Sequence, residues 1–516
     1  MASPQAPSSV RPLPAAGAAA RPRAAAAGGP AQKPHQPRPQ QQQAQQQQRQ
    51  QHQAQQQQQH PLAALVAAHF PPMTYGFAYG SGVFDQPDLS HDPGRPAPAP
   101  QLAAPPPQPL SGPMIDFIFV VEDPEDWHTQ NMERNASHYS FLRHLGPAAV
   151  AAAAGAVGAG VWFNTLVPLG GRLVKYGVTS RAAFLEDVTT WQHLYVPGRL
   201  HKPVLPLVAL RPAAGGPQHL HLSQNLQQFD QQQQLDQQHQ QQLDQRLQQQ
   251  QLDPDQEQHG GPGALGGYAE QLAADRAALA GALTLNLESA LRTALLLSPP
   301  TAPFRDVARR IAGLSYHGDV RMGLAEDSRK VERIVAGSFP GFAQLYLPLL
   351  RDAARWKLPG GAEWVALDGG GGDAAAAGGD GAAAAAAAAA VVRQDTSAEA
   401  RMHAISALPA ALLMRVAART GVRRPWAAAA AMQAPAGADA AAPWPRSELV
   451  AAAAAWRRDV AWAAVKGGRH EQLLHSGLRS IVRASSARQA AVGVLSAGLF
   501  KSARYLGAKL AKAWWR

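Results

Sequence analysis

Apolar residues in the first 210 positions occur in short runs that predict a β-sheet. The clearest run covers residues 114–121, where β-branched and aromatic residues surround Asp116. A shorter run at 77–80 leads into the sequence Gly-Ser-Gly at 80–82, which has the composition of a tight turn. The pattern therefore predicts two strands with polar residues at one end of each.

Two further apolar runs, at 158–168 and 172–179, flank Gly170-Gly171 and predict a β-hairpin. Helical patterns surround these strands. The sequence Asp-Pro-Glu-Asp at 123–126 predicts a helix start, because it offers a capping side chain, a first-turn proline and early acids. The other helices predicted from apolar spacing cover residues 61–73, 137–145, 181–187, 268–297, 304–311 and 328–350.

Long tracts of Gln, Ala, Gly and Pro interrupt this pattern. They occupy much of 1–60, 85–112 and 211–262 and most of 357–446. Such tracts bury too little apolar surface to build a core, so we expect a folded part of roughly 300 residues. The uncharged run at 144–171 is broken by two prolines and by polar residues, which favours a helix and a strand over a membrane span.

Composition and charge limit the compartment and the partner. The chain contains no cysteine, which excludes disulfides, thiolate catalysis and cysteine-based zinc sites. The net charge of +11 favours a polyanionic partner, either nucleic acid, nucleotide or anionic lipid. No acid precedes Asp85, and this Arg-containing, Ala-rich leader is typical of an organelle transit segment. The alternative is a disordered low-complexity tail, which the Gln-rich composition of residues 40–59 predicts for that part.

The Gly-Ser-Gly turn and the aspartate in the following strand are the first candidate site. Glycines at 80 and 82 let backbone N–H groups approach a phosphate, and the hydroxyl of Ser81 adds a donor. A carboxylate in an apolar strand is costly unless it is compensated, and a metal ion bound to Asp116 would compensate it. This is the layout of a nucleotidyltransferase fold. The alternative is an ordinary turn followed by an aspartate near a strand end.

Cations and one polar loop add to this candidate site. Lys175 lies within a predicted strand, where it either contacts phosphate or extends past the sheet to solvent. Arg199, His201 and Lys202 share a Gly/Pro-bounded loop that suits phosphate recognition, although such residues are commonly solvated. A polar loop between two predicted helices, which carries His317, Asp319 and Arg321, is a second wall of the site or an ion-paired connector.

The tail at 476–516 combines basic and apolar residues and has no acid. Its basic residues are Arg479, Arg483, Arg488, Lys501, Arg504, Lys509, Lys512 and Arg516. Its apolar residues recur at spacings of four and seven and form one helix face: Leu495, Leu499, Leu506, Leu510 and Trp514. An all-basic polar face favours an anionic membrane surface, and the alternative is a helix packed on the protein core.

The ordered set of these motifs resembles one family, the mitochondrial translocator assembly and maintenance proteins, which are mitochondrial phosphatidate cytidylyltransferases. The matching strings run from about 73 to 355 and recur in the tail. They are residues 77–84, 115–119, 127–128, 137–142, 158–161, 164–167, 171–178, 194–204, 311–322 and 480–486.

The resemblance implies an α+β architecture: a nucleotidyltransferase-fold domain, a helical winged-helix-like domain and a C-terminal amphipathic helix. The long disordered low-complexity insertions, predicted from composition, are foreign to the family's compact form but fall between the matching strings. It divides the chain into a leader, a nucleotidyltransferase domain, a Gln-rich insertion, a winged-helix-like domain, a mostly Gly/Ala segment and a membrane-associating tail. These segments are 1–60, 61–210, 211–262, 263–356, 357–446 and 447–516. The implied location is the matrix side of the inner mitochondrial membrane, as a peripheral protein.

The implied reaction converts CTP and phosphatidic acid to CDP-diacylglycerol and pyrophosphate with Mg²⁺, as an early step toward cardiolipin. Carried onto this sequence, Gly80, Ser81 and Gly82 hold the CTP phosphates and Asp116 binds Mg²⁺. Further catalytic or substrate-binding residues at matching positions are Lys175, Arg199, Lys202, Asp319 and Arg321. The membrane-contacting residues are Arg479, Arg483, Lys501, Arg504, Lys509 and Trp514.

One position departs from the wider nucleotidyltransferase pattern. Ile118 stands where a second carboxylate is usual, so Glu122, Asp123 or Asp319 would have to complete the metal site.

Two other functions are alternatives to this reaction. A non-catalytic assembly factor for the inner-membrane protein translocase has no physical need for Asp116 in an apolar strand. A nucleic-acid-binding protein is disfavoured because aromatic residues do not alternate with the basic loops.

Overall fold

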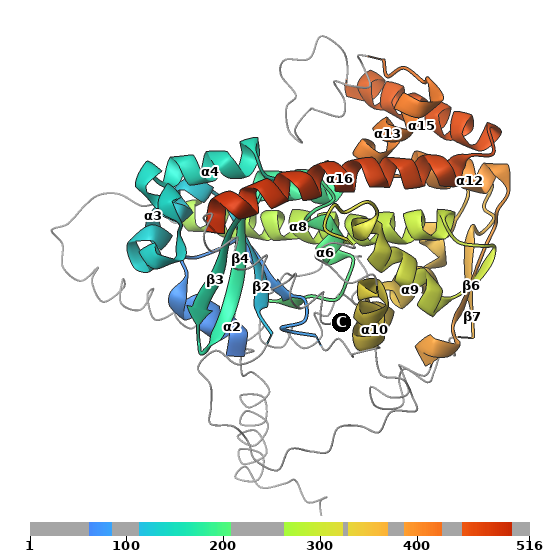
Figure 1. Cartoon of the computed structure of the whole chain (residues 1–516). Helices are drawn as coiled ribbons and strands as arrows, with labels where there is room; N and C mark the ends of the chain where they lie inside the picture. The colour runs from blue at the N-terminus through green and yellow to red at the C-terminus, as the bar shows by residue number, and fades with distance from the viewer. Residues whose placement is uncertain are drawn as a thin grey trace, which may run out of the picture. The chain divides into compact units, whose positions relative to one another are not determined.

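The computed structural model describes residues 61–84, 113–207, 263–322, 329–369, 386–425 and 446–497. The predicted leader, the Pro-rich loop at 85–112 and the Gln-rich insertion therefore lie largely outside the described residues. Within the described part, the chain forms a mixed α+β structure with two sheets (Figure 1).

The first sheet contains the candidate site. Its strands are β1 (Tyr75–Tyr79), β2 (Ile115–Val121), β3 (Trp162–Leu169), β4 (Arg172–Ser180) and β5 (Leu205–Pro206). The described strands lie in the order β3-β4-β2-β1-β5. β2 and β4 run parallel, whereas β1 pairs antiparallel with β2 and β5, and β3 pairs antiparallel with β4. The predicted hairpin around Gly170-Gly171 is confirmed as the β3–β4 pair, and both glycines have positive φ.

Side-chain alternation gives this sheet two different faces. Ile118 and Val120 of β2 pack with Phe184 of α5 (Arg181–Thr190) and with Leu279 of α8 (Gly263–Leu296). The opposite face of the sheet carries the aromatic residues of β2. They pack against α2 (Pro61–His69) and α3 (Pro124–Asn135) through Val66, Phe70 and Trp127. α4 (Pro147–Ala156) packs against α3 and β3.

The predicted helix start at residue 123 is confirmed. Asp123 Oδ1 accepts hydrogen bonds from the backbone N–H groups of Glu125 at 2.8 Å and Asp126 at 3.2 Å, and Pro124 is the first helical residue. The predicted helix over 137–145 is wrong. That segment forms two short 3₁₀ helices, η1 (Ala136–His138) and η2 (Phe141–Leu145), because Tyr139 between them has an extended backbone.

The second sheet belongs to the helical part. Its elements are β6 (Thr301–Pro303), α9 (Phe304–Gly313), η3 (Leu314–Tyr316), α10 (Lys330–Arg351), η4 (Ala353–Trp356), β7 (Val365–Asp368) and β8 (Val391–Gln394). The described strands lie in the order β6-β8-β7 and are antiparallel. The predicted helices at 268–297, 304–311 and 328–350 are confirmed as α8, α9 and α10, with boundaries shifted by a few residues.

Two helices occur where the sequence indicated mostly low complexity. They are α12 (Ala398–Ser406) and α13 (Ala410–Thr420), and their apolar side chains, including Ile405 and Leu412, are fully buried in the largest core cluster. The sequence did not predict these helices, because alanine supports a helix without showing which side is buried. The neighbouring 357–397 range also contributes β7 and β8, so the prediction of a mostly Gly/Ala tract without a core is wrong for these described residues.

The C-terminal part contains α15 (Arg446–Lys466) and α16 (His470–Ala497). The apolar side chains of α16, among them Leu474, Leu478 and Ile481, are buried in the protein core. Over its described residues, α16 therefore uses its apolar face for packing on the protein and leaves Arg479 and Arg483 exposed. The other predicted membrane residues, Lys501, Arg504, Lys509 and Trp514, lie outside the described residues. In the described part of the chain, no helix is both long and apolar enough to cross a bilayer.

Candidate active site

The Gly-Ser-Gly turn lies directly against Asp116. Gly80 has φ of +83°, and its carbonyl accepts hydrogen bonds from Val83 N at 3.1 Å and Phe84 N at 3.0 Å. A Cβ atom on Gly80 would lie 3.3 Å from Asp116 Oδ2, and one on Gly82 would lie 2.5 Å from the carbonyl oxygen of Met114. The positive φ of Gly80 and the close approach of Gly82 to the backbone at Met114 favour glycine at both positions, and the exposed Ser81 lies between them.

Asp116 and Lys175 form the centre of the site. They are neighbours in the parallel register of β2 and β4, and Lys175 Nζ lies 3.6 Å from Asp116 Oδ1. The lysine ammonium also lies 4.2 Å from the ring centroid of Phe163. Burial by itself lowers the pKa of Lys175, but Tyr79 and Asp116 outweigh it and the pKa is raised. Lys175 is therefore a fixed positive charge beside the carboxylate.

Arg199 stacks on two tyrosines that the sequence analysis missed. Its guanidinium carbon lies 3.8 Å from the ring centroid of Tyr195 and 5.2 Å from that of Tyr79, and it donates a hydrogen bond to the carbonyl of Tyr195. Burial raises the pKa of Tyr195, but Arg199, Lys175 and Arg321 together lower it below the ordinary value. A signal for both tyrosines existed: Tyr79 directly precedes the glycine turn, and Tyr195 stands one helical turn before Arg199.

Lys202 and His201 have different roles in the same loop. Lys202 donates hydrogen bonds to the Gly198 carbonyl and, at 3.0 Å, to Ser315 Oγ on η3. Burial, with the nearby charges of Arg199 and Lys330, lowers the pKa of Lys202 to about 7. His201 is fully buried and lies 3.1 Å from Asn286 Oδ1, and burial lowers its pKa to about 3. His201 is thus a neutral structural residue, and its predicted part in phosphate recognition is wrong.

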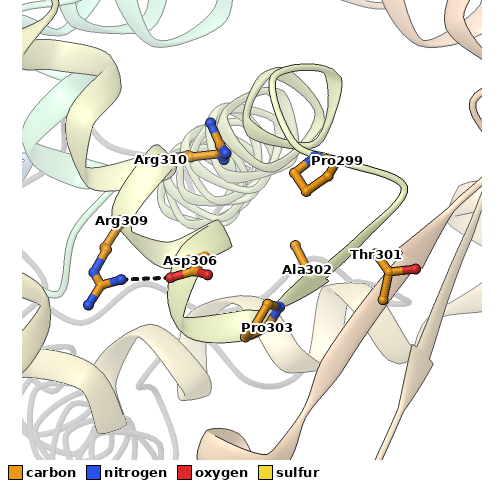
Figure 2. A pocket seen from close by; sticks show the side chains of 7 residues that line it. All are labelled: Pro299, Thr301, Ala302, Pro303, Asp306, Arg309 and Arg310. Atoms are coloured by element: carbon orange, nitrogen blue, oxygen red, sulfur yellow. Dashed lines mark hydrogen bonds and ion pairs between the residues drawn. The ribbon is translucent and has the colours of Figure 1, made fainter.

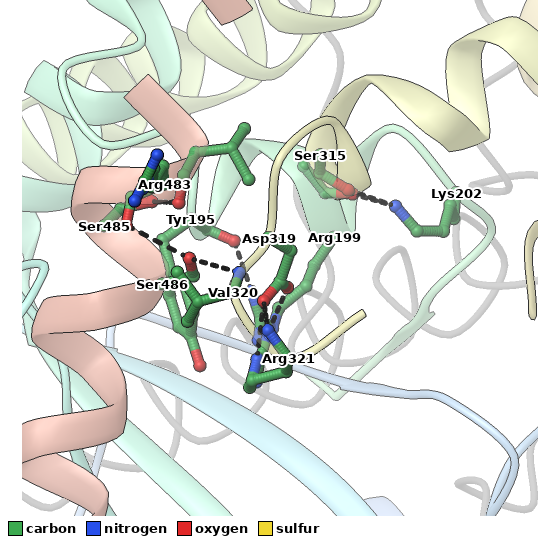
Figure 3. A network of polar contacts seen from close by, with 12 residues as sticks. Tyr195, Arg199, Lys202, Ser315, Asp319, Val320, Arg321, Arg483, Ser485 and Ser486 are labelled. Atoms are coloured by element: carbon green, nitrogen blue, oxygen red, sulfur yellow. Dashed lines mark hydrogen bonds and ion pairs between the residues drawn. The ribbon is translucent and has the colours of Figure 1, made fainter. Parts of the chain in front are cut away.

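Asp319 and Arg321 form a bidentate ion pair on the loop after η3 (Figure 3). Arg321 donates to Asp319 from Nε at 3.0 Å, from Nη2 at 2.6 Å and from its backbone N–H at 2.9 Å. The carboxylate side chain is only 2% exposed, whereas the arginine side chain is 34% exposed. This geometry favours Asp319 as the residue that orients Arg321, with Arg321 beside Tyr195 and Arg199.

A separate pocket lies on the helical part, at the junction of β6 and α9 (Figure 2). Its volume is about 220 Å³. Arg309 and Asp306 line the pocket and form an ion pair in which Nη1 and Oδ1 are 2.7 Å apart. None of the predicted site residues lines this pocket. The charged cluster around Asp116, which spans β1, β2, β4 and two loops, remains the candidate site.

A family model described as "Phosphatidate cytidylyltransferase, mitochondrial" matches residues 62–228 and 269–512. The chain belongs to this family. The two matched ranges contain every residue of the cluster around Asp116, and the gap between them falls largely in the Gln-rich insertion. The resemblance seen in the sequence is therefore confirmed, and it extends through α16.

Curated relatives named mitochondrial phosphatidate cytidylyltransferase come from several eukaryotes. The Xenopus laevis protein is 35% identical over 280 residues, which is 54% of this chain and 59% of the relative. The Bos taurus protein is 32% identical over 56% of this chain and 62% of the relative. The Danio rerio protein is 29% identical over 85% of this chain and 91% of the relative. The chain thus spans about three fifths of the length of the first two relatives.

Asp116 is the predicted Mg²⁺ ligand whose carboxylate lies against the Gly80 turn. Ile118, at the usual position of a second ligand, is fully buried among apolar residues. Glu122 contacts Arg181 at 3.7 Å and Asp123 caps α3, so both are engaged at the far end of β2 and do not complete the site. Among the described residues, no three His, Asp or Glu side chains gather as a metal site. The donor set fits Mg²⁺ when substrate phosphates supply further oxygen ligands.

Proposed function

We propose that this protein is a phosphatidate cytidylyltransferase, which forms CDP-diacylglycerol and pyrophosphate from CTP and phosphatidic acid. The observation that carries the proposal is the ion pair of Asp116 and Lys175 beside the Gly80 turn, with Arg199 and Lys202 on the neighbouring loop. Cations exceed carboxylates in this cluster, which suits two highly anionic substrates. Membership of the family supports the same reaction.

The element order supports the two domain types of the proposal. A strand, a glycine turn and a second strand bearing Asp116 on a mixed sheet have the layout of a nucleotidyltransferase fold. The series α8-β6-α9-α10-β7-β8, with sheet order β6-β8-β7, is consistent with the winged-helix-like domain that we propose. Lys202 on one domain contacts Ser315 on the other, which brings Arg321 toward the sheet.

The chemistry needs positioning and charge neutralisation rather than a covalent nucleophile. An oxygen of the phosphatidate phosphate forms a bond to the α-phosphorus of CTP, and the bond from that phosphorus to the bridging oxygen breaks as pyrophosphate leaves. Backbone N–H groups of the turn at 80–82 bind the departing phosphates. Lys175 and Arg199 offset the repulsion between the two anions, and Arg321 closes the site from the helical domain. Mg²⁺ held by Asp116 supplies further neutralising charge when it is bound.

The proposed location is the matrix face of the inner mitochondrial membrane, where the product would feed cardiolipin synthesis. The exposed Arg479 and Arg483 on α16 support contact with anionic headgroups, together with the basic tail that follows Ala497. A chain ending at Ala497 is expected to keep its activity in detergent and to lose activity on anionic liposomes. Equal activity of both chains on liposomes would contradict the role of the tail.

The decisive experiment measures CDP-diacylglycerol formation from labelled CTP and phosphatidic acid with Mg²⁺ in detergent. Asp116→Asn is expected to lower kcat/KM at least about 100-fold, because it removes the charge that binds the metal. Asp306→Asn is the matched control, since Asp306 forms an exposed ion pair outside the site. Full activity of Asp116→Asn would contradict the site assignment. No product from folded, Mg²⁺-supplied wild-type protein would favour the assembly-factor function instead.

A further inference from the structure

The C-terminal helix α16 makes polar contacts with the edge of the site-bearing sheet. Near its end, Gln489 is 6% exposed and bonds the segment that leads into β3. Its Oε1 accepts from Ala159 N, and its Nε2 donates to the carbonyl of Val161, both at 3.3 Å. A buried amide that satisfies both a donor and an acceptor of one segment fixes that segment relative to the helix.

The same helix also holds the loop that carries Arg321. The hydroxyl of Ser486, which is 2% exposed, accepts a hydrogen bond from Val320 N at 3.3 Å (Figure 3). His475 Nδ1 lies 2.9 Å from His317 Nε2, and their rings stack with centroids 4.6 Å apart. Gly318 has φ of +85° and approaches Arg479 so closely that a Cβ atom would lie 2.5 Å from Cγ of the arginine.

These contacts link two parts of the site that are far apart in the sequence. Val320 stands between Asp319 and Arg321, so the bond to Ser486 fixes the backbone of the ion pair itself. Gln489, one turn further along α16, fixes the segment before β3, whose Phe163 carries Lys175 on its ring. The helix therefore spans the distance between the arginine of one domain and the lysine of the other.

We infer that Ser486 and Gln489 are positioning residues for the reaction: Ser486 holds the loop that carries Arg321, and Gln489 holds the segment before β3. The inference rests on the proposed function for its catalytic meaning. It gives α16 a role besides the proposed membrane contact, because Ser486 and Gln489 are on the buried side of the helix. Neither residue touches Asp116 or Lys175, so each acts through the segment that it holds.

Ser486→Ala tests this inference, with Ser485→Ala as the matched control. Ser485 is 3% exposed, and its hydroxyl donates at 3.1 Å to Val482 within α16 itself, so its removal leaves the loop contact in place. In detergent, Ser486→Ala is expected to lower kcat/KM about three- to tenfold, the effect of one net hydrogen bond. Ser485→Ala is expected to stay within about twofold of wild type, since its lost bond is not one to the loop.

A double-mutant cycle separates positioning from general stability. If Ser486 acts through Arg321, then Ser486→Ala has no further effect on kcat/KM in an Arg321→Ala background. Amide hydrogen exchange of residues 317–322 is also expected to accelerate in Ser486→Ala and not in Ser485→Ala. The inference would be overturned by equal losses in both serine variants, by a Ser486 effect that persists without Arg321, or by unchanged exchange of the loop.

The exchange measurement needs no substrate, so it remains decisive if the proposed reaction is not observed. Wild-type protein without cytidylyltransferase activity would reject the proposed function. Accelerated exchange confined to 317–322 would still support the structural part of the inference, in which α16 holds this loop.

Discussion

The two faces of the five-stranded sheet both bury polar side chains, but they satisfy them differently. On the site face, Asp116 and Lys175 pair at 3.6 Å, and Arg199 adds a further positive charge. On the opposite face, the hydroxyl of Tyr176 accepts hydrogen bonds from Asn131 at 2.9 Å and Asn164 at 2.7 Å. The first cluster carries net charge, and the second consists of neutral amide, phenol and imidazole groups.

Consecutive residues of β4 belong to these different clusters, because side chains alternate along a strand. Lys175 points to the charged face and Tyr176 to the neutral one. A neutral network whose donors meet acceptors contributes to stability and needs no ligand. A cluster with excess cations is stabilised further by an anionic ligand. The charges that suit an anionic ligand and the neutral network therefore lie on opposite sides of the same strands.

Lys175→Met gives the largest effect expected from this comparison. The substitution removes a fixed charge while keeping a flexible apolar side chain over Phe163. We expect kcat/KM for CDP-diacylglycerol formation to fall about 100-fold, because an electrostatic contact to the reacting phosphates is lost. The free energy of unfolding, measured in urea, is expected to change little. A large loss of stability with little loss of activity would reverse the assignment of the two faces.

Tyr176→Phe is the opposite test, one residue further along β4. It leaves Asn131 and Asn164 without their shared acceptor, which is expected to cost about 1–3 kcal/mol of unfolding free energy. The kcat/KM of the remaining folded protein should stay close to wild type. Urea unfolding and the activity assay together check this outcome. A stability equal to wild type would show that the neutral network is not a stabilising feature.

Acid sensitivity tests the neutral face through His128. This histidine is 1% exposed, its Nδ1 lies 2.8 Å from the hydroxyl of Tyr139, and burial lowers its pKa to about 3. Its contribution to stability is therefore present above the ordinary value of about 6.5 and is lost as the pH falls from there toward 3. His128→Gln should flatten this part of a Tm-against-pH curve, and the exposed His144→Gln should not. An unchanged slope in His128→Gln would contradict burial of a neutral imidazole.

Proton uptake by Lys202 is the smallest expected effect. Because the pKa of Lys202 is lowered to about 7, its ammonium is partly deprotonated at pH 8 in the free protein. Binding of CTP places negative charge nearby and raises this pKa, so a fraction of a proton is taken up. Calorimetry of CTP binding at pH 8, in buffers of different ionisation enthalpy, measures that fraction. Lys202→Met should abolish this proton uptake. Uptake that persists in Lys202→Met would show that another group binds the proton.

Much of the site could be predicted because its signals are local. The glycine turn, Asp116 within its strand and the cap at Asp123 each depend on a few neighbouring residues. Tyr79 and Tyr195 were missed as site residues, since their positions before the glycine turn and before Arg199 do not show that Arg199 stacks on both. Glu122 and Asp123 were offered as metal ligands because they are near Asp116 in sequence. In space, strand β2 separates Glu122 and Asp123 from Asp116, because a strand rises about 3.3 Å per residue.

The membrane surface of the tail stays a prediction, because the side chains of its predicted apolar face, Leu495 to Trp514, lie outside the described residues. Basic residues on one helix face predicted a membrane surface, but an apolar face looks the same whether it packs on lipid or on protein. Leu474 and Leu478 are buried because α16 lies against the core, which depends on contacts with distant elements. Helices α12 and α13 were hidden for a related reason, since alanine supports a helix without marking which side is buried.

The sequence by itself determined the glycine turn, the carboxylate in its strand and the ordered motifs that place the chain in its family. These features depend on short spacings between residues and on the order of the motifs along the chain. The tertiary structure decided which charges meet. It also brought Asp319 into contact with Arg321, and α16 into contact with the loop that carries both residues. Val320 and Ser486 are 166 positions apart, and strand register and helix packing alone bring such groups within hydrogen-bond distance.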